Sequence, residues 1–401
     1  MKYAIILGDG MADYPIQALG GKTPLSAANK PFLNKIAIKS LVGLVKTVPD
    51  GMKPGSDVAN LSVLGYEPNK NYTGRSPLEA ASIGINLTDT DVTLRANLVT
   101  LSGEANYEDK TMVDYSSGEI TTEEARALIS DLKKSLDDDL HTLYSGVSYR
   151  HCLVTAFGKA EGGFTPPHDI TGKKIAEYLP TRKEYLDMMK KSYEILKNHP
   201  VNADRIKRGL NPANSLWFWG EGTRPALESF ESRYSLKGGM ISAVDLLKGI
   251  GKLTGMRVIE VPGATGTYET NFKGKAEACV SALTGGLDFV YVHMEAPDEC
   301  GHQGDLEHKI YSIERVDEVA STVAEGLSAA GERFRILVCP DHPTPLSTKT
   351  HATDPVPFLI YDSAAEYPGV AREFSEKAAA ETGVFFADGA ALMKEFINKT
   401  E

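Results

Sequence analysis

Short apolar segments alternate with helical patterns at both ends of the chain. The apolar segments are typical of buried strands and comprise Tyr3–Leu7, Leu41–Val48, Arg257–Val261, Asp288–Met294, Arg335–Cys339 and Val356–Tyr361. Helical stretches such as Lys275–Leu283 and Leu306–Leu327 separate the later segments. Continuous apolar strands that alternate with helices indicate a mostly parallel sheet with helices on both faces. The predicted fold class is therefore α/β.

The middle of the chain has a different pattern, which predicts a second α/β domain inserted into the first. Thr93–Leu101 and His151–Phe157 have the composition of short strands, and Thr122–Leu136 and Arg182–Lys197 have that of polar helices. We therefore assign residues 1–88 and 237–401 to the first domain and residues 89–236 to the inserted domain.

Composition and charge narrow the classes of partner. The 401 residues include 43 Lys+Arg and 54 Asp+Glu, so the formal net charge of −11 argues against nucleic-acid and anionic-membrane partners. The four cysteines form no CxxC pair, which argues against a disulfide framework or a zinc knuckle. No apolar run approaches the roughly 18 residues of a membrane span. We expect a cytoplasmic protein, in which an anionic substrate would need a local basic pocket.

Acidic residues and histidines follow several of the predicted strands. They are Asp9, Asp298, His302, Asp341, His342 and His351. The carboxyl ends of strands form the ligand crevice of open α/β sheets, so these side chains are expected to meet there. Oxygen and nitrogen ligands of this kind suit two divalent metal ions such as Mn²⁺, Zn²⁺ or Co²⁺.

Each of these residues has a simpler interpretation when it is taken alone. An Asp after a strand is commonly a turn residue or a helix cap, and His293 could be a strand histidine with ordinary hydrogen bonds. However, five of the nine histidines lie between His293 and His351, and Asp298 and His302 have a spacing that suits a shared ion. The combined pattern therefore favours a metal site.

The segment PGSDVANLSVLGY, residues 54–66, places Ser56 at the start of a predicted helix. Free backbone N–H groups and the helix dipole favour anions at such a position. A serine hydroxyl is a weak nucleophile, and coordination to a metal ion would activate it. The alternative is that Ser56 or Asp57 only caps the helix.

Several segments resemble a known enzyme family. They include LGDGMADYPI, PGSDVANLSVLGY, YTGRSPLEAASIGINL, PGATGTYETN, DFVYVHMEAPDECGH and DHPTPLSTKTHATDPVPFLI. The order Asp, Ser, DxxxH, DH and His resembles the alkaline-phosphatase metalloenzyme superfamily. More closely, the chain is similar to the archaeal-type 2,3-bisphosphoglycerate-independent (cofactor-independent) phosphoglycerate mutases. The segment WFWGEGTRPAL is closer to a branch of this family proposed to be homoserine kinases.

The resemblance implies a role for each candidate residue. It implies that one metal ion is held by Asp9, Ser56, Asp341 and His342, and a second by Asp298, His302 and His351. Manganese is favoured, and zinc, cobalt and magnesium are alternatives. It also implies that Ser56 is transiently phosphorylated. Substrate contacts are expected from Arg75 and, in the inserted substrate-binding domain, from Arg95, Arg150, His151 and Arg224.

The expected activity is interconversion of 3-phosphoglycerate and 2-phosphoglycerate through a phosphoserine. One alternative is a metal-dependent homoserine kinase of the same family, which would use ATP and recognise an α-amino group with an acidic residue near the arginines. A second alternative is an inactive metal-binding sensor. The expected partner is a small phosphorylated metabolite, and the expected assembly is a monomer or a small homo-oligomer.

Overall fold

The computed structural model describes all residues except 160, 368–370 and 398–401. It divides the chain into a first unit, Met1–Tyr72 with Ala226–Glu401, and a second unit, Thr73–Pro225. The second unit begins and ends earlier in the chain than the predicted residues 89–236. The reason at its start is that helix α5, Ser76–Ser82, packs against strands of the second unit.

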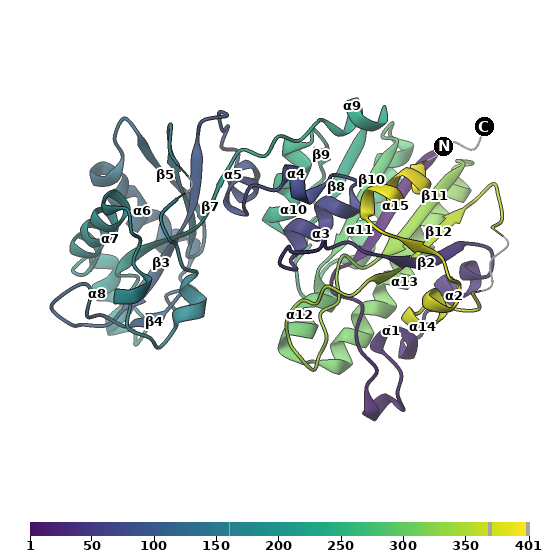
Figure 1. Cartoon of the computed structure of the whole chain (residues 1–401), viewed down its shortest axis with the longest axis horizontal. Coiled ribbons are helices and arrows are strands. Elements are labelled where there is room, and N and C mark those ends of the chain that lie inside the picture. The colour runs from purple at the N-terminus through teal and green to yellow at the C-terminus, as the bar shows by residue number, and fades with distance from the viewer. Residues whose placement is uncertain (160, 368–370, 398–401) are drawn as a thin grey trace. The chain divides into compact units, whose positions relative to one another are not determined.

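The first unit is built on an eight-stranded sheet (Figure 1). Its strands, in spatial order, are β13 (Phe385–Phe386), β2 (Leu41–Val45), β12 (Val356–Asp362), β11 (Phe334–Cys339), β1 (Lys2–Gly8), β10 (Phe289–Met294), β8 (Gly238–Ile241) and β9 (Arg257–Val258). All neighbours pair in parallel except β12, which is antiparallel to both β2 and β11. The mostly parallel α/β sheet predicted from the apolar segments is confirmed.

Helices cover both faces of this sheet (Figure 1). Ala4 and Ile6 of β1 lie in a core with helices α2, α11 and α13. On the opposite face, the Tyr3 ring packs against Phe396 of α15 with 5.6 Å between ring centroids. The helices of the first unit are α1 (Pro24–Ala27), α2 (Pro31–Ala37), α3 (Ser56–Val63), α4 (Pro68–Asn71), α9 (Phe230–Tyr234), α10 (Asp245–Leu253), α11 (Phe272–Thr284), α12 (Ala296–Gln303), α13 (Leu306–Ala329), α14 (Glu376–Glu381) and α15 (Gly389–Ile397).

The second unit has an antiparallel sheet, a feature that the sequence pattern did not predict. Its strands are β3 (Val92–Leu101), β4 (Met112–Asp114), β5 (His141–Val147), β6 (Arg150–Thr155) and β7 (Ser215–Thr223). The long, buried β3 pairs with β4, β6 and β7, and β5 pairs with β6. Besides α5, the helices are α6 (Thr122–Leu136), α7 (Lys183–Leu196) and α8 (Pro200–Lys207). The predicted helices at 122–136 and 182–197 are thus confirmed within one residue at each end.

Alternation along β3 gives the second sheet two different faces. Leu94, Ala96 and Leu98 enter a core with apolar residues of α6 and α7. Arg95 and Asn97 therefore point to the opposite face, where their neighbour on β7 is Trp219. On this same face, Cys152 and Val154 of β6 pack against Ala80 of α5, so Arg95 and Asn97 lie beside a packed region.

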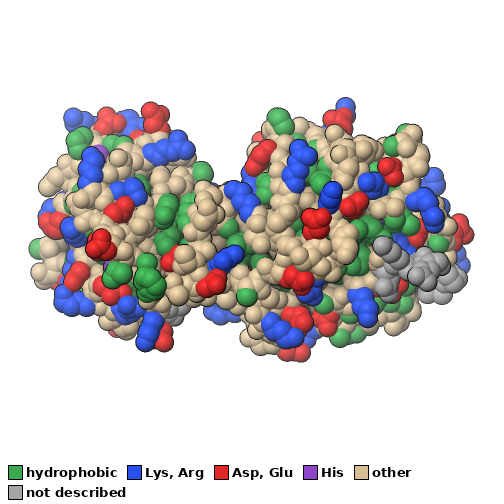
Figure 2. All heavy atoms as spheres, turned by 90° about the horizontal axis from the view of Figure 1, so that it is seen from above, with side chains coloured by type: hydrophobic (Ala, Val, Ile, Leu, Met, Phe, Trp, Pro, Cys, Tyr) green, Lys and Arg blue, Asp and Glu red, His purple; other side chains and the backbone are tan. Residues whose placement is uncertain are grey.

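Charged side chains of both signs are distributed over the surface of each unit. In the face seen in Figure 2, acidic and basic side chains are interspersed in both units. Among the described residues, no helix has the length and apolar character needed to cross a bilayer. All four cysteines are buried free thiols.

Candidate metal centre

Three neighbouring parallel strands bring the predicted metal ligands to one edge of the first sheet. Strands β11, β1 and β10 lie side by side in that order. Asp9 follows β1 directly, Asp341 and His342 follow β11, and Asp298 lies on α12, which begins two residues after β10. Because parallel strands end on the same edge, residues far apart in sequence meet at their carboxyl ends.

Asp9, Asp341 and His342 form one cluster, which we call the Asp9 group. One ligand atom of each lies within 4.8 Å of the others, and all three residues are buried. His342 Nε2 lies 3.4 Å from Asp341 Oδ2 and 3.6 Å from Asp9 Oδ1. Burial and the neighbouring Asp341 raise the pKa of Asp9 well above its usual range. Two carboxylates buried this close together need a compensating cation.

Asp9 Oδ1 is the atom best suited to bind that cation. It is buried and has no hydrogen-bond partner among the described residues. Asp9 Oδ2, by contrast, lies 2.8 Å from His293 Nε2. A buried carboxylate oxygen without a donor is costly, and a metal ion would satisfy it. The donor set and this free oxygen fit a divalent metal ion.

Asp298, His342 and His351 form a second cluster, the Asp298 group, whose ligand atoms also lie within 4.8 Å of one another. His302 adjoins it, with its Nε2 atom 3.2 Å from Asp298 Oδ2 and 2.9 Å from His351 Nε2. Imidazole nitrogens and carboxylate oxygens in this arrangement are ligands of Zn²⁺, Mn²⁺ and related ions. The two groups therefore form a site for divalent metal ions, with His342 common to both.

The ligand residues of the Asp298 group have pKa values that differ from their usual ones in the metal-free protein. Burial opposes ionisation of Asp298, but hydrogen bonds from His302 and His351 outweigh it and hold the pKa of Asp298 well below its usual range. The same hydrogen bond to Asp298 raises the pKa of His302 to about 9. Burial lowers the pKa of His342, which favours the neutral ring that a metal ion requires.

Ser56 is the first residue of α3, as predicted, and its hydroxyl faces the Asp9 group. Its Oγ atom lies 3.2 Å from His342 Nε2 and 3.5 Å from Asp9 Oδ2. Asp57 points elsewhere, because its Oδ2 atom accepts a hydrogen bond of 2.6 Å from the Tyr72 hydroxyl. The hydroxyl of Ser56 is therefore placed where an ion in the Asp9 group would contact it.

Close packing around the turn after β1 holds the two groups together. Gly10 has a φ of +59°, and a Cβ atom at this position would lie 2.6 Å from both Asp298 Oδ1 and Thr344 Oγ1. The Thr344 hydroxyl donates a hydrogen bond to Asp298 Oδ1. Only glycine allows the backbone beside Asp9 to approach the Asp298 group this closely.

Three of the five predicted substrate residues form a cluster in the second unit. Arg75 Nε and Arg95 Nε each lie 2.9 Å from a different oxygen of Glu79, and Arg150 is close enough to lower the pKa of that carboxyl together with them. The Arg95 guanidinium stacks 4.1 Å from the Trp219 ring. Burial lowers the pKa of Arg95 to about 10. Guanidinium groups are the side chains best suited to bind phosphate or carboxylate groups.

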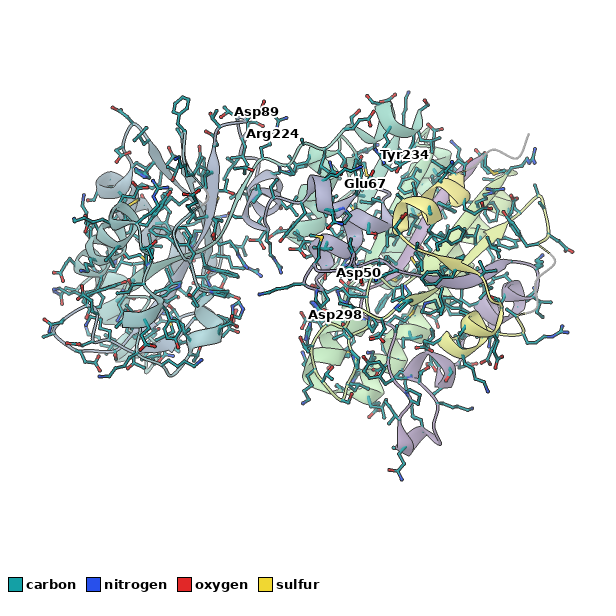
Figure 3. The ribbon with its side chains drawn as sticks, in the orientation of Figure 1. Asp50, Glu67, Asp89, Arg224, Tyr234 and Asp298 are labelled. Carbon is teal, nitrogen blue, oxygen red and sulfur yellow. The ribbon has the colours of Figure 1, made fainter. Side chains whose placement is uncertain are left out.

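The other two predicted substrate residues lie apart from this cluster. His151 follows Arg150 on β6 and pairs with Ala96 of β3, so its ring points to the face that packs against α6 and α7. Burial lowers the pKa of His151 to about 3. Arg224 is exposed and lies 3.2 Å from the exposed Asp89, and Figure 3 shows the two side chains next to each other. Neither residue therefore belongs to the cluster of arginines around Glu79.

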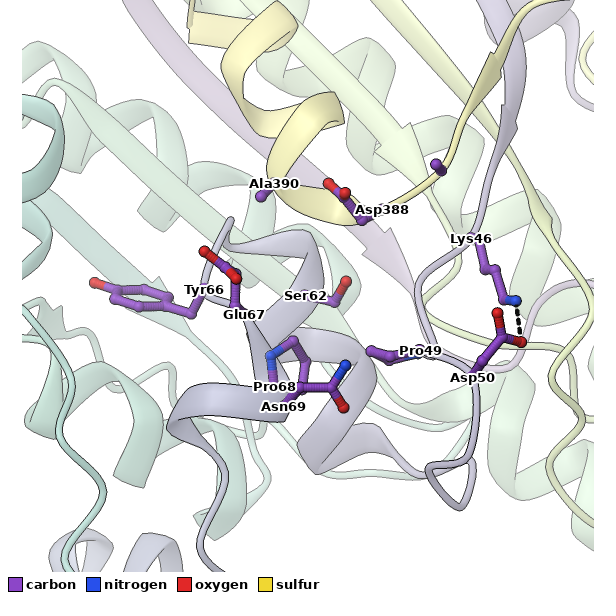
Figure 4. A pocket seen from close by; sticks show the side chains of 11 residues that line it. Lys46, Pro49, Asp50, Ser62, Tyr66, Glu67, Pro68, Asn69, Asp388 and Ala390 are labelled. Carbon is purple, nitrogen blue, oxygen red and sulfur yellow. Dashed lines mark hydrogen bonds and ion pairs between the residues drawn. The ribbon is translucent and has the colours of Figure 1, made fainter.

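The first unit also has a cavity of about 530 Å³ beside the C-terminal part of α3 (Figure 4). Its lining includes Ser62, Glu67 and Asp388, together with the ion pair Lys46–Asp50. No residue of the Asp9 group or the Asp298 group lines it. The cavity is therefore separate from the metal centre.

Sequence reasoning missed several residues that contact the site. Glu79 lies four residues after Arg75, a helical spacing that could have been noticed. Asn60 lies one turn after Ser56 and donates hydrogen bonds of 2.8 Å to Ser56 O and to Asp341 Oδ2. The spacing from Ser56 to Asn60 was visible in the sequence, but its partner Asp341 was not.

Known proteins similar to this chain include enzymes of one family. A family model described as 2,3-bisphosphoglycerate-independent phosphoglycerate mutase matches residues 37–202. A protein of that name from Methanosarcina barkeri is 50% identical over 384 residues, which cover 94% of this chain and 95% of the relative. A solved structure from Pyrococcus horikoshii has 30% identity and a TM-score of 0.83, with coverage of 100% of this chain and 98% of that one. The cofactor-independent phosphoglycerate mutase from Thermoplasma acidophilum has 27% identity and a TM-score of 0.68, with 99% coverage of both chains. Because the identity to the first relative extends over nearly the whole chain, this protein belongs to the 2,3-bisphosphoglycerate-independent phosphoglycerate mutase family.

Proposed function

We propose that this protein interconverts 3-phosphoglycerate and 2-phosphoglycerate without a bisphosphoglycerate cofactor, and that Ser56 carries the phosphoryl group between the two positions. The observation that carries the proposal is the position of Ser56 Oγ, 3.2 Å from His342 Nε2 at the start of α3. A nucleophile at a helix N-terminus beside a metal centre is arranged for phosphoryl transfer.

We propose two divalent metal ions as the cofactors, one in the Asp9 group with Ser56 and one in the Asp298 group with His302, and we favour manganese. Two bound ions would lower the pKa of the serine hydroxyl and stabilise the charge that develops on the transferred phosphoryl oxygens. Support for two adjacent ions comes from His342, whose Nε2 belongs to the Asp9 group while the ring lies 4.0 Å from that of His351.

The chain's own residues would carry out the transfer in two steps. Ser56 Oγ forms a bond to phosphorus, the bond from phosphorus to the 3-oxygen of the substrate breaks, and that oxygen takes up a proton as Ser56 gives one up. In the second step, the 2-oxygen of the retained glycerate attacks the phosphoserine, and the serine regains its proton. Protons and charge balance over the cycle, and no external phosphoryl donor is needed.

The second unit would bind the organic part of the substrate. We propose Arg75, Arg95 and Arg150 for this role, because Arg75 and Arg95 contact the Glu79 carboxylate and Arg150 is near enough to lower its pKa. Three cations around one anion leave positive charge for a second anionic partner. Arg95 is held by both Glu79 and the Trp219 ring, so it is oriented before the substrate arrives. His151 and Arg224 are less suited to this role because of their positions.

The kinase alternative requires an acidic residue for an α-amino group. Glu79 is an acidic residue among the arginines, but its Oε1 atom accepts a hydrogen bond from Arg75 and its Oε2 atom forms an ion pair of 2.9 Å with Arg95. This arrangement disfavours an ammonium ligand at Glu79 and supports the mutase.

Phosphorus NMR tests the proposal directly. Manganese-loaded protein is incubated with 3-phosphoglycerate alone, and a parallel sample contains ATP and homoserine. We expect 2-phosphoglycerate in the first sample and no homoserine phosphate in the second. Formation of homoserine phosphate without 2-phosphoglycerate would instead establish the kinase, and no phosphoryl transfer in either sample would support the sensor alternative.

A further inference from the structure

Strand β10 contributes no ligand to the Asp9 group, yet two of its side chains reach that group. Tyr291 and His293 are alternate residues of β10, so they point to the same face of the sheet. Both are buried, with exposed fractions of 0% and 1%. One reaches Asp341 through Asn60, and the other reaches Asp9 directly.

The contact from His293 fixes which oxygen of Asp9 is left free. His293 Nε2 lies 2.8 Å from Asp9 Oδ2, whereas Asp9 Oδ1 has no hydrogen-bond partner among the described residues. A carboxylate that could rotate would exchange the two oxygens. The hydrogen bond from His293 holds Oδ2, and so directs Oδ1 toward the centre of the group.

The other ring nitrogen of His293 is also constrained. Ser242 Oγ lies 3.1 Å from His293 Nδ1, and the same Oγ accepts a hydrogen bond of 3.0 Å from the Val244 backbone N–H. Since the Ser242 oxygen already accepts from the backbone, its hydroxyl hydrogen is free to be donated to Nδ1. The proton of a neutral His293 ring then lies on Nε2, where Asp9 accepts it.

Tyr291 imposes a similar constraint on Asn60. The Tyr291 hydroxyl donates a hydrogen bond of 2.5 Å to Asn60 Oδ1, while Asn60 Nδ2 donates to Asp341 Oδ2 and to Ser56 O, both at 2.8 Å. A flipped amide would place Oδ1 against a carboxylate and a carbonyl, which can only accept hydrogen bonds. Asn60 therefore has one favourable orientation, and it links Tyr291 to Asp341 and to the backbone of the serine.

We propose that Tyr291 and His293 of β10 are positioning residues of the metal centre: His293 orients Asp9, and Tyr291 orients Asp341 and Ser56 through Asn60. The inference rests on the proposed role of the Asp9 group as a metal site. Hydrogen bonds of this kind fix ligand geometry, and their loss typically lowers metal affinity about 10- to 100-fold.

Metal binding to stripped protein tests the proposal without relying on activity. The protein is titrated with Co²⁺, whose visible absorption reports ligand geometry, and with Mn²⁺ in competition with a chelator. His293→Leu removes the donor to Asp9, whereas His293→Gln can place an amide N–H near the position of Nε2. We expect His293→Leu to weaken one of the two ions about 10- to 100-fold and to change the cobalt spectrum. His293→Gln should recover most of the loss, and Tyr291→Phe should produce a smaller loss.

Asp9→Ala serves as the reference variant and separates two kinds of failure. If Asp9→Ala loses one ion while His293→Leu and Tyr291→Phe keep wild-type affinity and spectrum, the positioning role is wrong. If Asp9→Ala binds both ions like the wild type, the metal assignment itself is wrong. Should His293→Leu fail to fold, Ser242→Ala, which removes only the hydroxyl at Nδ1, decides the matter: unchanged affinity and spectrum in that variant and in Tyr291→Phe would overturn the proposal.

Discussion

Ser56 Oγ lies 3.2 Å from His342 Nε2, although 286 residues separate the two in the sequence. The contact joins the N-terminus of α3 to the loop after β11, and Asn60 strengthens it by donating hydrogen bonds to both Ser56 O and Asp341. The proposed nucleophile is thus tied to the same residues that are proposed to hold a metal ion, so its position and the metal geometry depend on each other.

The first prediction concerns the nucleophile. Ser56→Ala should lower mutase activity by at least about 10³-fold and abolish the phosphorylated enzyme, because it removes the oxygen proposed to carry the phosphoryl group. The check is kinetics combined with mass spectrometry of protein quenched during turnover.

Ser62 provides a matched control on the same helix. Its hydroxyl accepts a hydrogen bond of 3.3 Å from the Gly389 N–H, and the residue lines the cavity shown in Figure 4. Ser62→Ala should keep near wild-type activity and cost only about 1 kcal/mol of stability. Full activity of Ser56→Ala would rule out the phosphoserine.

The second prediction concerns a buried ion pair beside the centre. Lys309 Nζ lies 2.8 Å from Asp13 Oδ2 and donates a hydrogen bond of 2.7 Å to Thr344 O, and both side chains of the pair are at most 1% exposed. Lys309→Met should reduce the free energy of unfolding by about 3–5 kcal/mol, because Asp13 would remain buried without its partner. Urea denaturation of the metal-free protein measures the loss.

Lys377→Met is the corresponding surface control. Lys377 and Glu381 form an ion pair of 3.8 Å in which the side chains are 85% and 66% exposed. An exposed pair of this kind contributes about 0–1 kcal/mol. An equal decrease in the free energy of unfolding for the two variants would show that the buried pair stabilises the protein no more than the exposed pair.

The third prediction concerns Arg95. Arg95→Lys keeps the positive charge but loses the planar guanidinium group, which stacks on Trp219 and can form two hydrogen bonds to one anion. It should therefore lower kcat/KM about 10- to 100-fold, mainly by raising KM. Steady-state kinetics with 3-phosphoglycerate provide the measurement. Arg126→Lys on the exposed side of α6 is the matched control and should behave like the wild type. If Arg95→Lys has the wild-type KM, the arginine cluster does not bind the substrate.

The sequence predicted the main sheet well because its physical signals are local. The buried parallel strands of the first unit appear as continuous apolar runs; Asp9 follows β1 directly, and Asp341 lies two residues after the end of β11. Strand β7 of the second unit was not predicted, since its glycines Gly220 and Gly222 interrupt a strand pattern.

The residues of the site that were not predicted make contacts with segments far away in the sequence. In the sequence, nothing distinguishes Tyr291 from other apolar residues of a buried strand, and its partner Asn60 lies 231 positions away. The sequence was compatible with an ordinary strand histidine at position 293. Both ring nitrogens of His293 do have partners, Ser242 and Asp9. Only the structure identifies Asp9 as one of them. Side-chain pairing across a sheet depends on the order of its strands, which the pattern of one sequence does not specify.

The last prediction concerns pH and metal binding. A metal ion binds only a deprotonated imidazole, and the hydrogen bond to Asp298 raises the pKa of His302 to about 9 in the metal-free protein. Below this pH, an ion at the Asp298 group must displace the His302 proton. Its affinity should therefore rise about tenfold per pH unit between about 7 and 9 and then level off. Calorimetric titration in two buffers of different ionisation enthalpy should detect about one proton released per ion at pH 7.

Two variants identify the group that releases this proton. His302→Gln has no imidazole at the site, so it should bind more weakly but with a flatter pH dependence and without the proton release. His308→Gln is the matched control, because His308 also contacts an aspartate, Asp305, but stacks on Tyr268 outside both metal groups. It should keep the wild-type slope. If the affinity of the unmodified protein did not change between pH 7 and 9, His302 would not be a ligand that must lose its proton, and the composition of the Asp298 group would have to be revised.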